Sequence, residues 1–267
     1  MIGTRASGPD CLLGLGKRRP RVDSRTFKLA RYLAAGVPSP PSHRFWATAP
    51  MLSWPMMLND QLGDCVIAAS GHLIQEWSTL AAPPGTVVTD SQVLKAYEDV
   101  GGYVPGDSST DNGCVMLDAL NYWRQTGIGQ HQILAYVQVG QATGIAGSPF
   151  QRQFEQAIYL FGAAYIGLAL PLTAQGQSTW SVVSTSGDGA PGSWGGHCVP
   201  VLGYSPTGLL CVTWGGLQGM TWNFLRTYCD EAYAVLSSDW IRNAGTGAGF
   251  AVSGFNLAAL ESDLAKL

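Results

Sequence analysis

One cysteine and one histidine have the residue types and surroundings of a nucleophile and its base. Cys65 follows a polar turn that starts at Asn59 and begins an apolar run, which predicts that it lies at the first turn of a helix. At that position the unpaired backbone N–H groups and the helix dipole favour a thiolate. His197, 132 residues downstream, opens a predicted strand behind two glycines. A histidine delivered from a distant strand can serve as the base for such a thiol, so the pair predicts nucleophilic catalysis.

The other three histidines are weaker candidates for that base. His72 lies seven residues after Cys65 on the same helical face, but roughly 10 Å along the axis, so we expect a core or groove residue. His43 and His131 lie near predicted loops, where a surface position is expected. A cysteine at a helix start is, by itself, more often a small buried residue than a nucleophile. The setting of His197 is what favours catalysis.

Two amide side chains close to Cys65 are candidates for binding an oxyanion. Attack of a thiolate on a carbonyl places negative charge on oxygen, which a side-chain amide and the cysteine N–H can stabilise. Asn59 and Gln61 both precede Cys65 closely enough to supply the amide. Asp64 opposes a thiolate because its charge is adjacent; we expect its side chain to cap the helix instead.

Composition restricts the class of protein and its partners. Of the 267 residues, 46% are hydrophobic and only 12% are charged, which predicts a compact globular protein with ample core. The net charge of −3 provides no broad basic field, so we expect no nucleic-acid partner. Basic residues cluster between Lys17 and Arg31, which we interpret as a solvated segment laid along the domain.

Metal, membrane and export signals are weak. The six cysteines are scattered and include no CxxC pair, which favours reduced thiols and gives no support for a structural zinc site. We expect no cofactor. No apolar run reaches the roughly 18 residues of a membrane span, and the opening segment lacks the apolar core of a signal peptide. A cytoplasmic location is therefore expected.

Hydrophobic periodicity divides the chain into a helical half and a strand half. We expect helices over 65–80, 89–100, from about 117 to 127, and 150–162, with Thr89 and Gln92 at capping-box spacing. Short apolar runs at 164–170, 197–204, 209–214 and 232–236 are typical of strands. The predicted fold is α+β with two lobes and an antiparallel sheet, and a site is expected in the cleft between them. The expected units are an N-terminal arm (1–44), a helical lobe (about 45–162), a sheet lobe (about 163–242), and a Gly-rich linker with a short helix (243–267).

Five segments, in order along roughly 45–236, resemble the papain-like cysteine peptidase family, closest to bacterial or phage-type members without a large propeptide. The Cys65-to-His197 separation also falls in the range of about 130–150 residues of papain-type enzymes. The matching segments are Phe45-Trp46, Asn59 through Ala69, Asp111-Asn112-Gly113 with the helix after it, Gly195-Gly196-His197 through Tyr204, and Val212-Thr213-Trp214-Gly215.

The resemblance implies a two-lobed papain-like fold and a role for each matching residue. Cys65 would be the nucleophile and His197 the general base and acid. Asn59, six residues before the cysteine, stands in the place of the family's oxyanion glutamine, with Gln61 as the rival donor. Trp214 would pack beside the site.

The chain departs from the family in two respects that bear on activity. Val212 aligns with the asparagine that orients the catalytic imidazole, and strand alternation is expected to direct Thr213 to the other face. His197 would then lack its usual partner. The arm is too short for the family's usual inhibitory propeptide, so control of activity would take another form. We also expect Trp180 and Trp194 to be exposed and to offer apolar contact to a substrate.

The leading hypothesis is a thiol hydrolase that cleaves peptide or isopeptide bonds of a peptide or protein substrate through a thioester. Two alternatives remain open on the same fold. One is a catalytically inactive structural or binding protein, such as an assembly component, which Val212 favours. The other is an acyl transferase or amidase, which the nucleophile alone does not distinguish from a peptidase.

Overall fold

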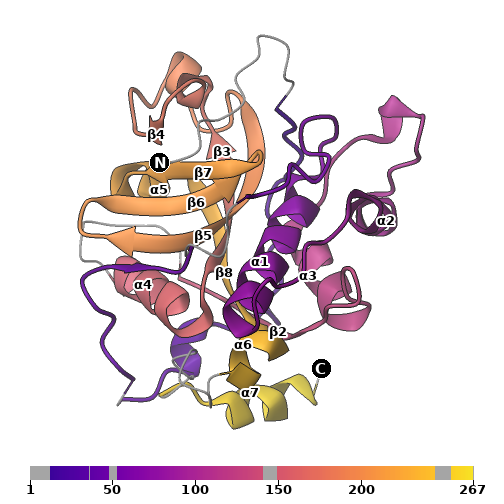
Figure 1. The fold of residues 1–267 in the computed structure, drawn as a ribbon. Coiled ribbons are helices and arrows are strands. Elements are labelled where there is room, and N and C mark those ends of the chain that lie inside the picture. Colours follow the sequence, from indigo (N-terminus) through magenta and orange to yellow (C-terminus); the bar gives the residue numbers. More distant parts are fainter. Residues whose placement is uncertain (1–12, 36, 48–52, 141–148, 244–253, 267) are drawn as a thin grey trace.

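A group of helices on one side and a large sheet on the other make up the molecule (Figure 1). The computed structural model describes residues 13–35, 37–47, 53–140, 149–243 and 254–266. The helices are α1 (Cys65–Ala81), α2 (Asp90–Gly101), α3 (Met116–Gln125), α4 (Pro149–Phe161), α5 (Trp222–Tyr228), α6 (Ser238–Asn243) and α7 (Leu257–Leu264). The strands are β1 (Arg44–Phe45), β2 (Ile133–Gln138), β3 (Ala164–Leu170), β4 (Thr179–Trp180), β5 (Gly195–Ser205), β6 (Gly208–Thr213), β7 (Gly216–Met220) and β8 (Cys229–Ser237).

The strands form one sheet in the order β2-β8-β3-β5-β6-β7-β4, with β1 paired to β5. The pairs are antiparallel except for the short β4–β7 pair, which is parallel. The predicted α+β class with an antiparallel sheet is thereby confirmed. The arrangement adds two features that the prediction lacked: β2 extends the sheet from within the predicted helical half, and α5 and α6 lie among the strands.

The predicted helices lie close to their observed bounds, and local sequence explains why. The capping box is present at α2, where the Thr89 side chain accepts a hydrogen bond from Gln92 N–H and the Gln92 side chain accepts one from Thr89 N–H. The C-terminus of α2 is closed by Gly102 in a left-handed conformation, which glycine adopts without steric cost. A helix was also predicted near the C-terminus, and α7 occupies that place.

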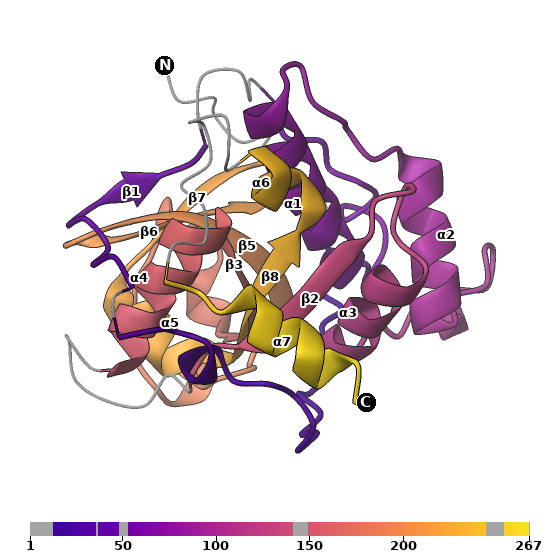
Figure 2. The ribbon, with the colours of Figure 1, turned by 90° about the horizontal axis from the view of Figure 1, so that it is seen from below.

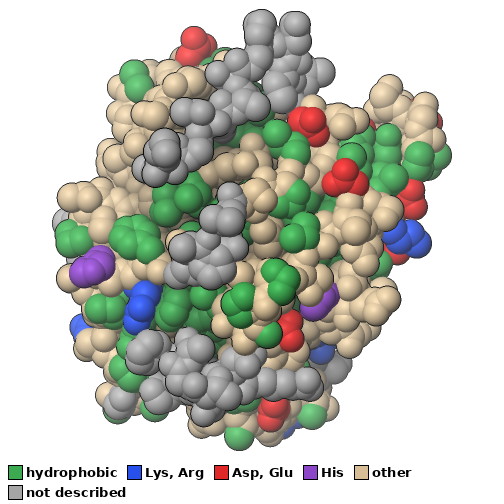
Figure 3. Space-filling view, in the orientation of Figure 1, with side chains coloured by type: hydrophobic (Ala, Val, Ile, Leu, Met, Phe, Trp, Pro, Cys, Tyr) green, Lys and Arg blue, Asp and Glu red, His purple; other side chains and the backbone are tan. Residues whose placement is uncertain are grey.

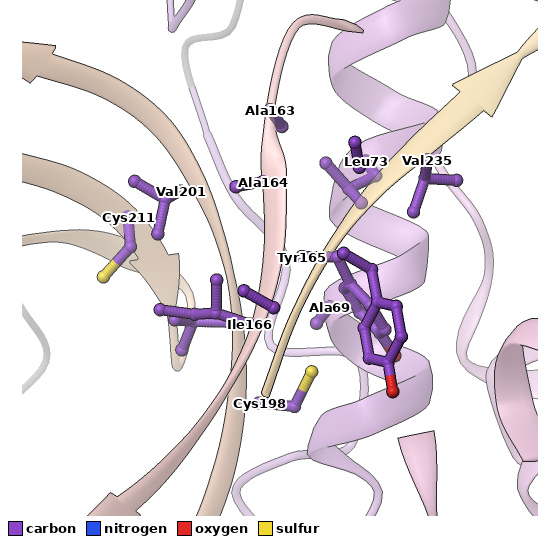
Figure 4. Packing of buried hydrophobic residues seen from close by; sticks show 14 of the residues in the cluster. Ala69, Leu73, Ala163, Ala164, Tyr165, Ile166, Cys198, Val201, Cys211 and Val235 are labelled. Atoms are coloured by element: carbon purple, nitrogen blue, oxygen red, sulfur yellow. The ribbon is translucent and has the colours of Figure 1, made fainter. Parts of the chain in front are cut away.

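Helix α1 packs directly on the sheet and is buried along nearly its whole length. Figure 4 shows Ala69 and Leu73 of α1 beside Tyr165 of β3, with the Cys198 side chain of β5 directed toward the same helix. Tyr165 donates a hydrogen bond to the Val66 carbonyl at 2.6 Å, which ties the first turns of α1 to the sheet. Helix α4 lies on the opposite side of the molecule from α2 and α3 (Figures 1 and 2). The N-terminus of α1 is thus fixed against β5.

The segment around residues 28–33 keeps its basic residues Lys28 and Arg31 exposed, as predicted, but its apolar residues enter the core. Leu29 and Tyr32 are fully buried in the core. The Tyr32 hydroxyl donates to Asp263 of α7 at 3.0 Å, and Figure 2 shows α7 lying across this end of the molecule. Apolar residues spaced three apart within a basic segment account for the burial, because Leu29 and Tyr32 can face the core together.

The visible surface has few charged side chains. On the face in Figure 3, Lys and Arg side chains are scattered and do not form a continuous basic field. Among the described residues, no helix is both long enough and apolar enough to cross a membrane.

Candidate active site

Cys65 is the first residue of α1, as predicted, and it is almost fully buried. Asp64 occupies the N-cap position, but its side chain makes no capping hydrogen bond, so the predicted capping role is wrong. Its Oδ1 instead accepts a hydrogen bond from Asn59 Nδ2 at 3.0 Å. Burial raises the pKa of the Asp64 carboxyl well above its usual value, and the bond from Asn59 offsets only part of that rise. This carboxyl therefore carries less negative charge next to the thiol than its sequence position suggests.

The thiol of Cys65 lies against backbone of two distant segments. Burial raises its pKa to about 12, while backbone N–H groups of Cys198 and Gly16 act in the opposite direction and lower it. Cys198 directly follows His197 on β5, so the structure brings the predicted nucleophile to the strand that carries the predicted base. In this state, however, the thiol is protonated at neutral pH because its surroundings exclude water.

His197 is buried on β5, and its Nε2 lies 2.6 Å from the Thr213 hydroxyl oxygen. The expectation that Thr213 points away from the imidazole is wrong, and the strand register explains the error. Cys211 pairs with Val201, and both Thr213 and His197 lie an even number of residues from that pair. Side chains two apart share a face of a strand, so Thr213 faces His197 and Val212 does not.

Trp214 packs beside the imidazole, as the family resemblance predicted. The two rings are stacked with centroids 4.2 Å apart and planes 15° from parallel. Trp194 is half-buried and packs on Trp214 at 5.4 Å between ring centroids. Trp180 was expected to be exposed but is fully buried, because it packs between Trp214 and Phe224. The indole of Trp214 therefore holds one face of the histidine, while Thr213 holds one of its nitrogens.

The two candidate oxyanion donors are in different environments. Asn59 is buried, and its Nδ2 lies within hydrogen-bond distance of Asp64 Oδ1 and of the carbonyl oxygens of Leu62 and Gly14, both at 3.2 Å. Gln61 is exposed. Only Asn59 is turned toward the segment that passes Cys65.

The remaining histidines have other roles. His72 is buried on α1, and its Nε2 lies 2.9 Å from the Pro55 carbonyl. Burial lowers the pKa of His72 to about 4, so it is a neutral core residue, as expected. His43 is exposed, and His131 lies 3.4 Å from Asp239 near the surface.

A peptide backbone already passes over the thiol. We call residues 13–18 the arm segment. Its Gly14 N–H donates to the Asn59 carbonyl at 2.7 Å, and Trp214 Nε1 donates to the Gly14 carbonyl at 3.1 Å. Farther along, the Cys114 N–H donates to the Gly16 carbonyl at 2.8 Å, so the segment bonds to both sides of the molecule.

The second half of the arm segment continues this pattern. Lys17 N–H donates to the Gly196 carbonyl at 3.0 Å, and Arg18 N–H donates to the Cys114 carbonyl at 2.8 Å. Gly196 directly precedes His197, and Cys114 follows the Asp111-Asn112-Gly113 turn. The arm segment thus bridges the turn on the helical side and the strand on the sheet side as an extended strand would.

Glycines on both sides make room for this backbone. A Cβ added to Gly16 would lie 1.6 Å from the Gly63 carbonyl oxygen, and one added to Gly113 would lie 1.8 Å from the Gly16 carbonyl oxygen. A Cβ on Gly196 would lie 2.0 Å from the Lys17 carbonyl oxygen. Real Cβ atoms do not approach so closely. Glycine at these positions therefore leaves the room that the backbone of the arm segment occupies.

The wall opposite β5 is itself held in place by hydrogen bonds. Asp111 accepts from the Gly63 N–H at 3.0 Å, and the Tyr97 hydroxyl accepts from the Gly113 N–H at 2.9 Å. The Tyr97 hydroxyl also donates to Asp111. This network fixes the turn before Cys65 relative to the turn that binds the arm segment.

Lys17 is the most buried charge of the arm segment. Its Nζ lies 2.8 Å from Asp230 Oδ2 and 3.3 Å from Glu231 Oε1, and its side chain is 1% exposed. Burial alone would lower the pKa of Lys17, but the two carboxylates outweigh it and raise the pKa. The interpretation of the basic region as solvated is therefore wrong for Lys17, whereas the other basic residues of the region are exposed as predicted: Arg18, Arg19, Arg21, Arg25, Lys28 and Arg31.

Three features of the candidate site were not predicted from the sequence: Thr213, Lys17 and the arm segment itself. The register of β6 could not be read from the sequence, so Thr213 was placed on the wrong face. The arm segment did carry a signal, since its Leu13-Gly14-Leu15-Gly16 alternation removes side chains at every second position. Such spacing is typical of a backbone that must approach another backbone closely.

Among the described residues, no group of three His, Cys, Asp or Glu side chains is arranged to hold a metal ion. The described cysteines, which exclude Cys11, are free thiols.

Comparison with solved structures identifies the architecture. Xylellain, a cysteine protease from Xylella fastidiosa, matches with a TM-score of 0.63 at 12% identity, over 87% of this chain and 99% of that one. The fold is that of papain-like cysteine proteases. Digestive procathepsin L 3 of Tenebrio molitor matches with a TM-score of 0.56 at 12% identity, over 85% of this chain and 77% of that one. Bromelain from Ananas comosus matches with a TM-score of 0.52 at 10% identity, over 74% of this chain and 100% of that one.

Sequence comparison adds nothing to this: no family model matches the chain, and neither does any curated protein. At these identities the likeness establishes the fold alone.

Proposed function

We propose that this protein is a cysteine peptidase in which Cys65 is the nucleophile and His197 the general base and acid. The observation that carries the proposal is the path of the arm segment, because a peptide backbone lies against the Cys65 thiol between two walls of fixed hydrogen-bonding groups. A substrate peptide that replaced the arm segment would meet the same groups. The papain-like fold supports a peptide or protein as the substrate.

Each step of the reaction then has a group to perform it. His197 takes the thiol proton, and the Cys65 sulfur attacks the carbonyl carbon of the substrate. As the C–S bond forms, the carbonyl electrons move to oxygen, where Asn59 Nδ2 donates a hydrogen bond. The C–N bond breaks, and His197 gives its proton to the leaving amine. Water then attacks the thioester, losing a proton to His197, and the released sulfur regains that proton.

Asn59 is the better oxyanion donor of the two predicted residues. Its Nδ2 carries two hydrogens, while three acceptors lie within 3.2 Å, one of them the Gly14 carbonyl of the arm segment. The bond to the Gly14 carbonyl shows that Nδ2 reaches a carbonyl oxygen of a peptide lying in this place. Gln61, which is exposed, has no comparable position.

Thr213 takes the orienting role that the sequence alone assigned to no residue. The hydroxyl 2.6 Å from Nε2 fixes the imidazole ring, and the stacked Trp214 limits its rotation. An inactive protein would be favoured if His197 lacked such a partner. Thr213 supplies that partner, so the peptidase is favoured over the inactive alternative.

The arm segment must move before a substrate can bind. It fills the place of the substrate backbone, and it presents the Gly16 N–H to the sulfur, a donor that a thiolate cannot attack. In this state the arm segment thus covers the Cys65 thiol. The arm segment would thus control access to Cys65.

Cleavage of a fluorescent protein substrate by the full chain tests the proposal. The chain should be assayed with the arm segment in place and with Gly16→Ala, which cannot keep it there, each with and without Cys65→Ala. Cleavage that appears with Gly16→Ala and is lost with Cys65→Ala or His197→Ala is the expected result. If the opened variant exposes a reactive Cys65 but cleaves none of a mixed peptide library, the peptidase proposal is wrong.

A further inference from the structure

The pocket that holds Lys17 is more than a surface ion pair. Nζ has three hydrogens, and three acceptors surround it: Asp230 Oδ2 at 2.8 Å, Glu231 Oε1 at 3.3 Å and the carbonyl of Arg18 at 3.2 Å. Glu231 has a side chain only 1% exposed, and Asp230 lies at the pocket mouth with a side chain 31% exposed. The ammonium group of Lys17 thus makes hydrogen bonds to Asp230 and to the Arg18 carbonyl and an ion pair with Glu231, in a place where its side chain is 1% exposed.

The sheet builds this pocket. Gly167 on β3 pairs with Glu231 on β8, and a Cβ at Gly167 would lie 2.0 Å from Lys17 Cε. The missing side chain at Gly167 is what leaves room for a long aliphatic stem. The Tyr233 hydroxyl donates to Glu231 Oε2 at 3.0 Å, so one carboxylate oxygen is held while the other faces the lysine. Glu231 is thus held by a group outside the arm segment.

The pocket is adjacent to the reacting centre. Lys17 follows Gly16, whose N–H lies against the Cys65 thiol, and its own N–H bonds to the residue before His197. Any peptide that replaces the arm segment along this path places one side chain in the same pocket. The chemistry of the pocket then selects among peptides.

Charge decides what that side chain must be. A carboxylate as buried as Glu231 is costly without a cation, and removing one partner of a buried pair is strongly destabilising. A neutral side chain would displace Lys17 and leave Glu231 unpaired, whereas lysine or arginine would replace the lost charge. Arginine has the longer reach and a planar fork that matches carboxylates.

We propose that Asp230 and Glu231 are specificity-determining residues that select a lysine or arginine side chain in the peptide bound beside Cys65, with Lys17 as the built-in occupant of their pocket. The consequence for catalysis rests on the proposed peptidase function; the selection of a basic side chain on binding does not. Substrates of this protein would therefore be peptides or protein segments with a basic residue next to the cleavage site.

Binding of synthetic peptides tests the selection separately from catalysis. The receptor is the full chain with Gly16→Ala, to free the site, and Cys65→Ala, to prevent cleavage. The first peptide has the sequence of residues 13–19, Leu-Gly-Leu-Gly-Lys-Arg-Arg. Two variants have equal net charge: one with methionine at the position of Lys17, the other with methionine at that of Arg18. Affinity is measured by fluorescence anisotropy.

The parent peptide and the one changed at Arg18 should bind at least tenfold more tightly than the one changed at Lys17. Arginine at the position of Lys17 should keep the affinity. The discrimination should disappear when the receptor also carries Asp230→Asn and Glu231→Gln, with thermal unfolding checked for each variant. Equal affinities of the two charge-matched peptides would overturn the proposal.

A second measurement uses the chain's own arm segment and needs no added peptide. Lys17→Arg and Lys17→Met are compared for the rate at which iodoacetamide alkylates Cys65. The arginine variant should stay close to the wild-type rate, and the methionine variant should react at least tenfold faster because the arm segment is held less tightly. Equal rates for the two variants would also overturn the proposal. Loss of cleavage with retained peptide discrimination would instead refute only the peptidase function.

Discussion

Gly16→Ala should uncover Cys65 without changing any charge. The added Cβ would lie 1.6 Å from the Gly63 carbonyl oxygen and 2.3 Å from its carbon, so the arm segment cannot keep its place. Its displacement breaks the bonds from the Cys114 N–H to the Gly16 carbonyl and from the Lys17 N–H to the Gly196 carbonyl. Each backbone hydrogen bond contributes about 1 kcal/mol net, so the loss of these two bonds stabilises the open state, in which the arm segment is displaced, by about 2 kcal/mol relative to the covered state. That corresponds to an open population about 30-fold larger.

Alkylation of Cys65 by iodoacetamide, followed by intact mass and peptide mapping, measures this opening. The rate should rise by at least about 30-fold, and further because solvent access removes the burial that raises the pKa of the thiol to about 12. Gly216→Ala is the matched control, since a Cβ there meets no heavy atom within 4 Å. Gly16→Ala with an unchanged alkylation rate and an unchanged melting temperature would refute the idea that the arm segment covers the thiol.

Two further predictions concern buried polar groups. Thr213→Val should lower kcat/KM for a peptide substrate about 10- to 100-fold in the Gly16→Ala chain, because a hydrogen bond to a charged imidazole contributes about 1.5–3 kcal/mol. Thr213→Ser keeps the hydroxyl and should change kcat/KM little. Equal effects of the two substitutions would contradict the orienting role. Glu76 is fully buried, makes no side-chain hydrogen bond, and has a pKa raised well above its usual value by burial. Its folded state holds a proton that the unfolded chain releases above about pH 4.5, so stability falls as pH rises. Glu76→Gln should therefore raise the free energy of unfolding by about 1–3 kcal/mol at pH 7, a gain that shrinks toward pH 4; a gain independent of pH in thermal scans would count against this account.

The sequence predicted the elements well where one period dominates. Helix α1 and strand β3 carry long apolar runs that leave little choice of structure, and β3 was predicted with its observed bounds. Strand β2 was missed although its buried residues alternate at Ile133, Ala135 and Val137, because it stands between two helices and was read as their connection. A local hydrophobic pattern predicts a helix or strand, but which strand it pairs with is known only from the folded sheet.

The candidate site was predictable in part for the same reason. Cys65 and His197 could be found because their local settings, a helix start and a glycine-flanked strand, are visible in the sequence. Thr213 could not, because its direction depends on how β6 pairs with β5, and a shift of one residue reverses every side chain. The ion pair from Lys17 to Asp230 joins residues 213 positions apart, which no local pattern reports.

The raised pKa of Cys65 does not argue for an inactive site once its cause is traced. A nucleophile disabled by the core would be buried by side chains that no ligand could displace. Here burial raises the pKa, and the arm segment lies against the thiol as part of that cover, although its Gly16 N–H and Lys17 charge themselves lower the pKa. That segment is held by backbone hydrogen bonds and one buried lysine, contacts that a competing peptide of the same chemistry can make in its place. Displacement would expose the sulfur at the N-terminus of α1, where a thiolate is favoured. Under the proposed function, burial of the thiol and recognition of a peptide are therefore two consequences of the same backbone contacts.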